Sequence, residues 1–551
     1  MKKTLRLAAI FGAALSFGTV AWAGSERLST ELKPENRTGS RTAQNVEVIV
    51  QYKVTPTEAH HAKVAALGGK LNAKMDFIKG AHYTVPSSAL DSLANDPDVA
   101  YITPNRAIKP TFDNITNGTI DASYMNGEGY TGTGVGVAII DSGIVDLPDF
   151  HTGSTDRIVY QQSFVGGTAV DQYGHGTHVA GILAGNGNGT VYQGVAYNAN
   201  LINLRVLDQN GNGTDSNVIL AIATAIELRS QYNIKVINLS LGRQVYESAS
   251  LDPLCQAVEA AWKAGIFVAV AAGNDGRDNS QQTMGYGTIT SPGNDPYVMT
   301  VGAIKAEGTT DRSDDRVASY SSKGPTLYDH YVKPDVVAPG NMVVSTLPAG
   351  LTLSNEFPAN RIGTSNYFVL SGTSMATPVV AAWAAMGYQD NTTITNDDIK
   401  ADFMLAATKN FPVASSVVVD PTTGNSYTSY YDVFTVGAGE LDMQYINSIS
   451  FVPVGYSAKS PSVAYSASAG NVSLQGLGAA NVVWGANVVW GANVVWGASA
   501  ILADNVVWGA NVVWGASTMQ GFNVVWGANV VWGASTTADA SFCIGNINSE
   551  P

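Results

Sequence analysis

The sequence predicts an α/β protein whose main domain is a parallel sheet with helices on both faces. Short continuous runs of apolar and β-branched residues alternate with helical segments over residues 110–449, as expected of strands that are buried on both faces. A compact segment with βαββαβ order precedes this domain, and a fixed six-residue repeat follows it. The fold class is therefore a parallel α/β domain between a small ferredoxin-like α+β unit and a β-prone repeat region.

The composition indicates a folded protein that does not bind polyanions. Hydrophobic residues make up 45% of the 551 residues, which is enough for a large core, whereas charged residues make up only 13%. The formal net charge of −14 argues against nucleic acid or an anionic membrane surface as a partner.

The N-terminus indicates export. Basic residues within the first six positions precede an apolar run over 7–20, and Ala21 and Ala23 then supply the small residues of a cleavage site. Residues 1–23 are therefore expected to be a signal peptide, so that the protein is secreted or otherwise extracytoplasmic. The run is shorter than the ~20 residues that span a membrane, and we expect no transmembrane anchor.

A polar linker over residues 24–44 leads to the small α+β unit at 45–109. Its strands are predicted at 46–52, 71–77, 81–85 and 99–102, and its helices at 56–67 and 87–95.

The main domain is expected to extend over residues 110–449. Buried strands are predicted at 135–140, 201–206, 236–239 and 266–271, with helices at 216–228 and 253–264.

After a second linker (450–480), the segment 481–534 contains the hexapeptide NVVWGA seven times, always in the same six-residue frame, and a tail follows at 535–551. Fixed-period hexads are typical of a β-solenoid, and Val-Val-Trp favours strand. Stacked hairpins, or a segment that orders only on a partner, remain open. The tryptophans could form a repeating core, which we favour, or contact a cell surface or polysaccharide.

The chain has two cysteines. Cys255 lies in an apolar helical stretch, where a buried free thiol is expected. A disulfide with Cys543 is permitted outside the cytoplasm, but the sequence leaves it open.

Three glycine-rich segments contain an acid, a histidine and a serine in that chain order. Asp141 stands in AIIDSG (138–143), His175 in GHGTHVAG (174–181) and Ser374 in SGTSMATP (371–378). Serine is a weak nucleophile without an adjacent base. His175 can take its proton, while Asp141 fixes the imidazole tautomer and stabilises the imidazolium.

A fourth polar residue completes the predicted chemistry. Asn274 follows an apolar strand in AAGN (271–274), and its amide can donate to an oxyanion together with the Ser374 backbone N–H. That backbone N–H is expected at a helix N-terminus, where unpaired N–H groups face developing negative charge.

These segments resemble the subtilisin-like serine protease (subtilase) family, nearer its proteinase K-like branch, over residues 45–449. The resemblance implies an inhibitory propeptide of the I9 type at 45–109, removed autocatalytically near Lys109 or Pro110. It also implies segments that flank or line the bound peptide, with small walls that admit large apolar or aromatic P1 side chains: Gly211, Asn212, Gly213, Ser240, Leu241, Gly242, Ala272 and Gly273.

The resemblance also places structural calcium ligands at Asp149, Asn186 and Asn188. One carboxylate, Asn amides and loop carbonyls would supply the oxygen ligands that Ca²⁺ prefers.

The function implied is a secreted serine endopeptidase that hydrolyses peptide bonds of protein or peptide substrates through an acyl-enzyme. It would be made as a zymogen, with its own propeptide as intramolecular inhibitor. The alternative is a surface or matrix-associated protein whose Trp-rich repeat is the functional part and whose protease domain serves processing.

Overall fold

The computed structural model describes residues 25–29, 32–33, 45–108, 128–307, 309, 312–408, 411, 413–420, 424–442, 457–466 and 471–475, and four short strands further on. The predicted signal peptide, the new N-terminus near Lys109, Cys543, the tail and most of the repeat lie outside these residues.

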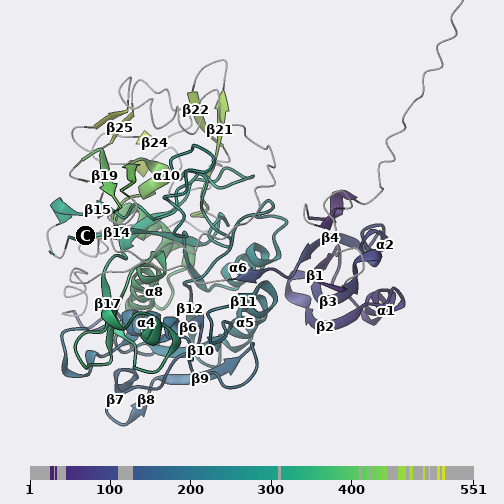
Figure 1. Ribbon diagram of the computed structural model, residues 1–551, viewed down its shortest axis with the longest axis horizontal. Helices are drawn as coiled ribbons and strands as arrows, with labels where there is room; N and C mark the ends of the chain where they lie inside the picture. The colour runs from purple at the N-terminus through teal and green to yellow at the C-terminus, as the bar shows by residue number, and fades with distance from the viewer. Residues whose placement is uncertain are drawn as a thin grey trace, which may run out of the picture.

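The N-terminal unit is a four-stranded antiparallel sheet with two helices (Figure 1). Its strand order is β2-β3-β1-β4. The elements are β1 (Asn45–Tyr52), α1 (Glu58–Ala66), β2 (Lys70–Met75), β3 (Gly80–Pro86), α2 (Leu90–Ala94) and β4 (Val99–Pro104). Single 3₁₀ turns, η5 (Asp76–Ile78) and η6 (Ser87–Ala89), precede β3 and α2.

The main domain is built on an eight-stranded sheet in the order β15-β14-β13-β12-β6-β10-β9, with β16 also paired to β14. The sheet is mixed rather than wholly parallel, because β15 runs antiparallel to β14 while the other pairs are parallel. Its strands are β6 (Gly136–Asp141), β9 (Ile158–Ser163), β10 (Asn200–Arg205), β12 (Ile234–Leu239), β13 (Phe267–Ala271), β14 (Met299–Lys305), β15 (Arg316–Val317) and β16 (Val336–Pro339).

Helices cover both faces of this sheet, as predicted. The helices α4 (His175–Ala184) and α8 (Thr373–Asp390) pack on each other, and so do α5 (Asp215–Leu228) and α6 (Pro253–Lys263) (Figure 1). Almost all of α4 and α8 is buried, so both lie inside the domain rather than on its surface.

Further described helices and strands lie around this core. They are α7 (Thr352–Glu356), α9 (Asn396–Ala406), α10 (Val433–Val436), β7 (His151–Thr152), β8 (Thr155–Asp156), β17 (Val343–Thr346), β18 (Tyr367–Leu370), β19 (Ser415–Val419), β20 (Ser426–Tyr430), β21 (Ser462–Ser466) and β22 (Asn471–Gln475).

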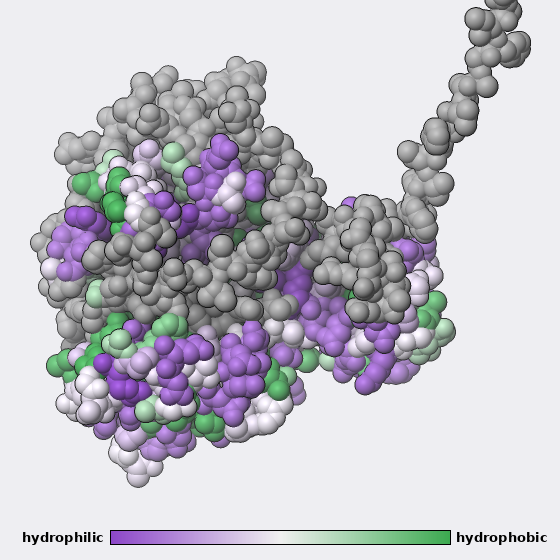
Figure 2. Space-filling model, viewed as in Figure 1, coloured by the Kyte–Doolittle hydropathy of each residue, from purple (hydrophilic) through white to green (hydrophobic). Residues whose placement is uncertain are grey.

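The N-terminal unit docks on the side of the main domain that carries α5 and α6 (Figure 1). In the space-filling view it forms a smaller lobe, whose coloured surface shows both hydrophilic and hydrophobic side chains (Figure 2). Ile49, Met75 and Ile78 join the same buried apolar cluster as the core of the main domain. The chain leaving the unit forms β5 (Ala107–Ile108), which pairs antiparallel with β11 (Gly213–Thr214).

The described strands of the repeat pair antiparallel. They are β23 (Val488–Val489) with β24 (Val495–Trp496), and β25 (Val506–Trp508) with β26 (Val512–Trp514). This is the pairing of the hairpin alternative, whereas a solenoid of six-residue sides pairs its strands in parallel.

One further observation concerns the whole described part of the chain. Within it, no helix is both long enough and apolar enough to cross a membrane.

Cys255 is a free, buried thiol that donates to Asn294 Oδ1 at 3.2 Å, and burial raises its pKa.

We expect the core around α8 to dominate stability. Trp383 is fully buried and stacks on Phe403 with ring centroids 4.3 Å apart. Trp383→Ala should lower the free energy of unfolding by about 3–5 kcal/mol through lost burial and a cavity. Urea denaturation in a Ser374→Ala background, which lacks the predicted nucleophile, measures this. Val417→Ala, at a residue 59% exposed, should change it by less than about 0.5 kcal/mol; equal effects would contradict the prediction.

Candidate functional site

Asp141 and His175 are joined by a buried hydrogen bond. Asp141 is the last residue of β6, at the carboxyl edge of the sheet, and His175 is the first residue of α4. His175 Nδ1 lies 2.7 Å from Asp141 Oδ1, and both side chains are fully buried. Because an ionised carboxylate only accepts hydrogen bonds, Nδ1 carries the hydrogen in this pair. The Ser142 backbone N–H donates to the same Oδ1 at 2.7 Å.

A glycine lets the helix reach the strand so closely. A Cβ atom on Gly176 would lie 2.3 Å from the Gly143 carbonyl oxygen and 3.1 Å from Asp141 Cβ, and the first distance is far inside van der Waals contact. Any side chain at this position would therefore push the start of α4 away from β6 and lengthen the hydrogen bond between Asp141 and His175.

A buried carboxylate that the sequence reasoning missed fixes the loop before α4. Asp171 Oδ1 accepts hydrogen bonds from Ser142 Oγ (2.9 Å) and from the backbone N–H groups of Tyr173 (2.9 Å) and Gly174 (2.8 Å). Its Oδ2 accepts from Thr177 N (3.0 Å) and Thr177 Oγ1 (2.6 Å). Asp171 thus satisfies N–H groups in the first turn of α4.

The same network connects that loop to the strand. Ser142 Oγ, which donates to Asp171, accepts from the Gly176 backbone N–H at 2.8 Å. The loops that carry Asp141 and His175 therefore share one hydrogen-bonded junction. In the sequence, this contact is visible only as Asp171 standing six positions before Thr177. That spacing does not predict that the Asp171 carboxylate is buried.

Ser374 lies in the first turn of α8, next to the end of β12. Ser374 Oγ donates to the Ser240 carbonyl at 3.1 Å, and Ser240 Oγ donates to the Ser374 carbonyl at 2.8 Å. Asn238 Nδ2 in turn donates to Ser240 Oγ at 2.9 Å. Ser240, predicted to contact a bound peptide, therefore also fixes the start of the helix that presents Ser374.

Asn274 presents its amide nitrogen with a fixed orientation. Its Oδ1 accepts from Thr373 N at 2.9 Å and from Thr373 Oγ1 at 3.0 Å. A backbone N–H only donates, so the atom that faces it must be the oxygen. Nδ2 is buried and has no hydrogen-bond partner among the described residues. An unpaired buried donor beside Ser374 is what an oxyanion site requires.

The predicted peptide-binding segment at 211–213 lies at an edge. Gly213 belongs to β11 and pairs with Ile108 of the N-terminal unit. Asp208 closes the preceding loop, because its backbone N–H donates to the Asn212 carbonyl and its Oδ1 accepts from Asn212 N at 2.9 Å. Gly211, with φ +73°, has no room for a side chain, since a Cβ would lie 2.5 Å from the Tyr173 ring.

The other residues that were predicted to line the peptide-binding site lie around Thr290. A Cβ on Gly242 would lie 2.7 Å from Thr290 Oγ1, and one on Gly273 would lie 2.7 Å from Thr290 Cγ2. Ala272 and Leu241 are buried beside them. Residues 240 and 241 follow β12 without regular structure, and Gly242 lies in an isolated β-bridge.

His178, one turn after His175, has a structural role. Its Nε2 donates to the Phe368 carbonyl at 3.0 Å. Burial lowers the pKa of His178 to about 3, so that it stays neutral.

The three predicted calcium ligands lie together, and two of their side-chain oxygens accept hydrogen bonds within the protein. Asp149 Oδ1 accepts from the Tyr367 hydroxyl at 2.6 Å, and Asn186 Oδ1 accepts from Asn188 N at 2.7 Å. Asn186 Nδ2 donates to the carbonyls of Pro148 (3.0 Å) and His151 (2.6 Å). Hydrogen-bond donors thus face Asp149 Oδ1 and Asn186 Oδ1.

A buried cationic side chain stands behind this loop. Arg157 donates to the carbonyls of Asp149 (2.8 Å), Ala184 (2.7 Å) and Ala199 (2.9 Å). The guanidinium supplies positive charge next to Asp149.

A sequence model described as the subtilase family of peptidases matches residues 132–426. The serine protease AprX of Bacillus subtilis is 38% identical over 347 residues, which cover 60% of this chain and 74% of that protein. Subtilisin E of the same organism is 33% identical over 367 residues, which cover 65% of this chain and 84% of that protein.

Among solved structures, fervidolysin of Fervidobacterium pennivorans, described as a keratinolytic enzyme related to subtilisin, aligns with a TM-score of 0.55. The alignment has 20% sequence identity and covers 76% of this chain and 63% of fervidolysin. The chain thus spans less than two thirds of fervidolysin, and the likeness concerns the fold.

We expect Asp171→Asn to destabilise the loop before α4. The asparagine side chain would place an NH₂ group where one of the two Asp171 oxygens now accepts hydrogen bonds. The buried donors on that side would lose their acceptor, which should lower the free energy of unfolding by about 1–3 kcal/mol. Urea denaturation in the Ser374→Ala background measures this loss. Asp146→Asn, at a carboxylate with a 63% exposed side chain, is the control; if the two variants lose equal stability, Asp171 does not fix the loop.

Proposed function

The chain belongs to the subtilase family of serine proteases, and on that basis we propose that it is a secreted endopeptidase with Asp141, His175 and Ser374 as its catalytic triad. The observation that carries this assignment is the fully buried 2.7 Å hydrogen bond between His175 Nδ1 and Asp141 Oδ1. Such a bond leaves Nε2 as the nitrogen that exchanges protons with a nucleophile.

Each member of the triad has one task. His175 takes the proton from Ser374 Oγ as the oxygen attacks the carbonyl carbon of the scissile peptide bond. The protonated imidazole then gives this proton to the leaving amine, and an acyl-enzyme on Ser374 remains. Water, activated by His175 in the same way, hydrolyses the ester. Asp141 stabilises the imidazolium in both halves of the reaction.

The oxyanion of each tetrahedral intermediate is assigned to Asn274 Nδ2 and the Ser374 backbone N–H. The bonds from Thr373 to Asn274 Oδ1 hold the amide before substrate arrives. A donor that is already oriented needs no reorganisation as charge develops. The position of Ser374 at the start of α8 adds the positive end of the helix dipole.

The N-terminal unit is assigned as an inhibitory propeptide. Support comes from β5, which pairs with the edge strand β11 at Gly213, a residue predicted to contact substrate. A substrate chain and residues 107–108 would compete for the same edge. Self-cleavage after this segment, followed by release of the unit, would expose it. Export is supported by the basic and apolar N-terminal segment, and the expected substrates are proteins and peptides in extended conformation.

We expect Ser374→Ala to abolish hydrolysis of an unstructured protein such as reduced, alkylated casein. Triad knockouts lose about 10⁶-fold in turnover, a figure known from the related subtilisin. The variant should also remain uncleaved between the N-terminal unit and the main domain, which intact mass spectrometry reports. Equal activity of wild type and variant would contradict the assignment of the nucleophile.

Removal of the Asn274 amide should lower kcat and leave KM nearly unchanged. Asn274→Leu should reduce kcat by about 10²–10³-fold, the loss that such a donor causes in the related subtilisin. Asn274→Asp retains an oxygen toward Thr373 but lacks the NH₂ group, so it should lose kcat while keeping its thermal midpoint. If Asn274→Asp kept wild-type kcat, the donor role would be wrong.

A further inference from the structure

Arg106 lies on the path that we assign to substrate. The ladder of β5 with β11 pairs Ile108 with Gly213 and Ala107 with Thr214. The next residue outward continues this pattern, because the Asp215 backbone N–H donates to the Arg106 carbonyl at 2.8 Å. A substrate chain bound along β11 would therefore place a residue where Arg106 now stands.

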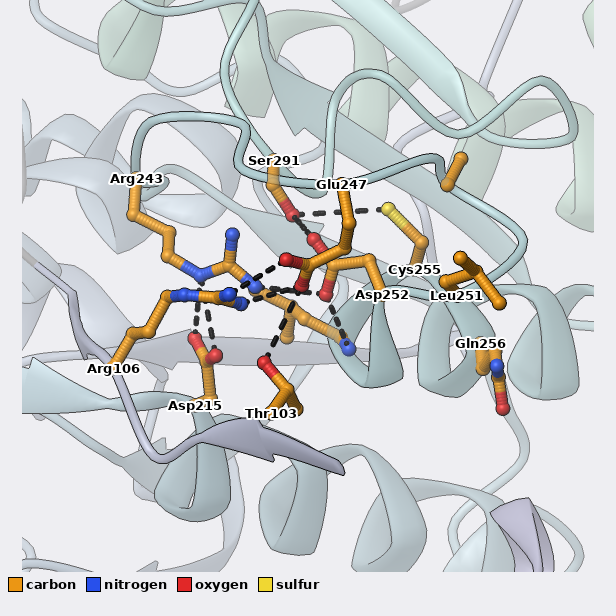
Figure 3. A network of polar contacts seen from close by, with 12 residues as sticks. Thr103, Arg106, Asp215, Arg243, Glu247, Leu251, Asp252, Cys255, Gln256 and Ser291 are labelled. Carbon is orange, nitrogen blue, oxygen red and sulfur yellow. Dashed lines mark hydrogen bonds and ion pairs between the residues drawn. The ribbon is translucent and has the colours of Figure 1, made fainter. Parts of the chain in front are cut away.

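The Arg106 side chain reaches into the main domain, where its guanidinium lies beside Glu247; we call this place the pocket (Figure 3). Its Nη1 and Nη2 contact Glu247 Oε1 and Oε2 at 2.5 and 2.6 Å, a bidentate pair. The two side chains are only 6% and 4% exposed. The face of the Tyr246 ring lies 4.8 Å from the guanidinium carbon. A planar cation held by a carboxylate and an aromatic face is matched to arginine rather than lysine.

The rest of the pocket is fixed by a second ion-pair cluster. Arg243 bridges two buried carboxylates, with Nε 2.9 Å from Asp215 Oδ1 and Nη2 2.8 Å from Asp252 Oδ1. Ser291 Oγ donates to Asp252 Oδ2 at 2.7 Å. These contacts arise within the main domain and do not involve the N-terminal unit (Figure 3).

The charge balance of the pocket calls for a second cation. Asp215, Asp252 and Glu247 supply three carboxylates, whereas the main domain supplies one guanidinium, that of Arg243, which is shared by the two aspartates. Glu247 takes its bidentate partner from the N-terminal unit. When that unit leaves, a carboxylate oriented for a guanidinium remains with the main domain. An arginine of a bound substrate would restore this bidentate pair and cover the carboxylate again.

We propose that this pocket, centred on Glu247 and Tyr246, is a specificity subsite that selects arginine at one fixed position on the N-terminal side of the scissile bond. The inference rests on the proposed endopeptidase function and on substrate binding along β11. In the zymogen, Arg106 of the N-terminal unit fills the subsite. In the active enzyme, an arginine of the substrate takes its place.

A cleavage-site profile tests the subsite. The purified, self-processed protein is used to digest a denatured protein mixture, and the new termini are mapped by mass spectrometry. Arginine should occur about tenfold above its background frequency at one upstream position, since a group built to hydrogen-bond one side chain rejects those that lack it. Glu247→Gln should bring this frequency close to background and leave the other positions unchanged.

Two controls show whether a loss of arginine preference in Glu247→Gln could come from misfolding of that variant. Glu259→Gln, on α6 at a residue that pairs with Lys263, should keep the arginine preference. Peptides that carry arginine, lysine or citrulline at the selected position, cut by the wild-type enzyme, should differ in kcat/KM by about tenfold or more in favour of arginine. This arm does not depend on the folding of any variant.

The preference should weaken on acidification. Burial raises the pKa of Glu247 to about 7, even with Arg106 beside it. The charged groups facing Glu247 are Arg106, Asp252 and Arg243, and the last two are paired with each other. This pKa is that of Glu247 covered by the N-terminal unit. A substrate arginine that covers Glu247 in the same way should keep the pKa raised, so the ratio of kcat/KM between arginine and citrulline peptides should fall as the pH is lowered from 8 to 6.

The outcomes separate the two proposals. A protein that cleaves nothing would overturn the proposed function. Cleavage without arginine enrichment at any upstream position, or with enrichment that survives Glu247→Gln, would overturn the subsite and leave the pocket as an anchor for the N-terminal unit alone.

Discussion

The hydrogen bond between Asp141 and His175 sets the constraint on which the rest of the site depends. A carboxylate and an imidazole can share a 2.7 Å contact away from water only if a strand end and a helix start are brought together. Gly176 allows the approach, and Asp171 with Ser142 fixes both loops. The central position of β6 and the burial of α4 make that approach rigid, because neither element can shift without disturbing the core.

Buried charge is the second feature that organises the structure. In the following cases, buried cations lie beside carboxylates or accepting carbonyl oxygens. Lys333 and Lys400 both reach Asp335 inside the core, and Arg243 bridges Asp215 and Asp252. Arg157 provides positive charge beside Asp149 and donates to the backbone carbonyls of Asp149 and Ala184. Arg106 differs from these cations, because it comes from the N-terminal unit and pairs with a carboxylate of the main domain. This difference turns a structural ion pair into a candidate for recognition.

Much of this arrangement could be predicted from the order of residues. Continuous apolar runs located β6, β10, β12 and β13 to within two residues, because strands buried on both faces exclude polar side chains. The sheet is nevertheless mixed, because β15 runs antiparallel to β14. The sequence did not predict this strand, since it consists of two residues without a periodic pattern. The hexapeptide repeat predicted the spacing of the short strands but not whether they pair in parallel or antiparallel, because both kinds of strand use the same Val-Val-Trp pattern.

The sequence by itself predicted the residues that we assign to catalysis: an aspartate, a histidine and a serine in glycine-rich segments, with an asparagine after a strand. Local sequence suffices there because each residue must end a strand or begin a helix. Only the tertiary structure decided what holds them. Asp171, the bonds that orient Asn274 and the pairing of Arg106 with Glu247 join residues that are far apart in the chain or lack a local pattern. Burial and charge balance are properties of the packed molecule, so no local pattern reveals them.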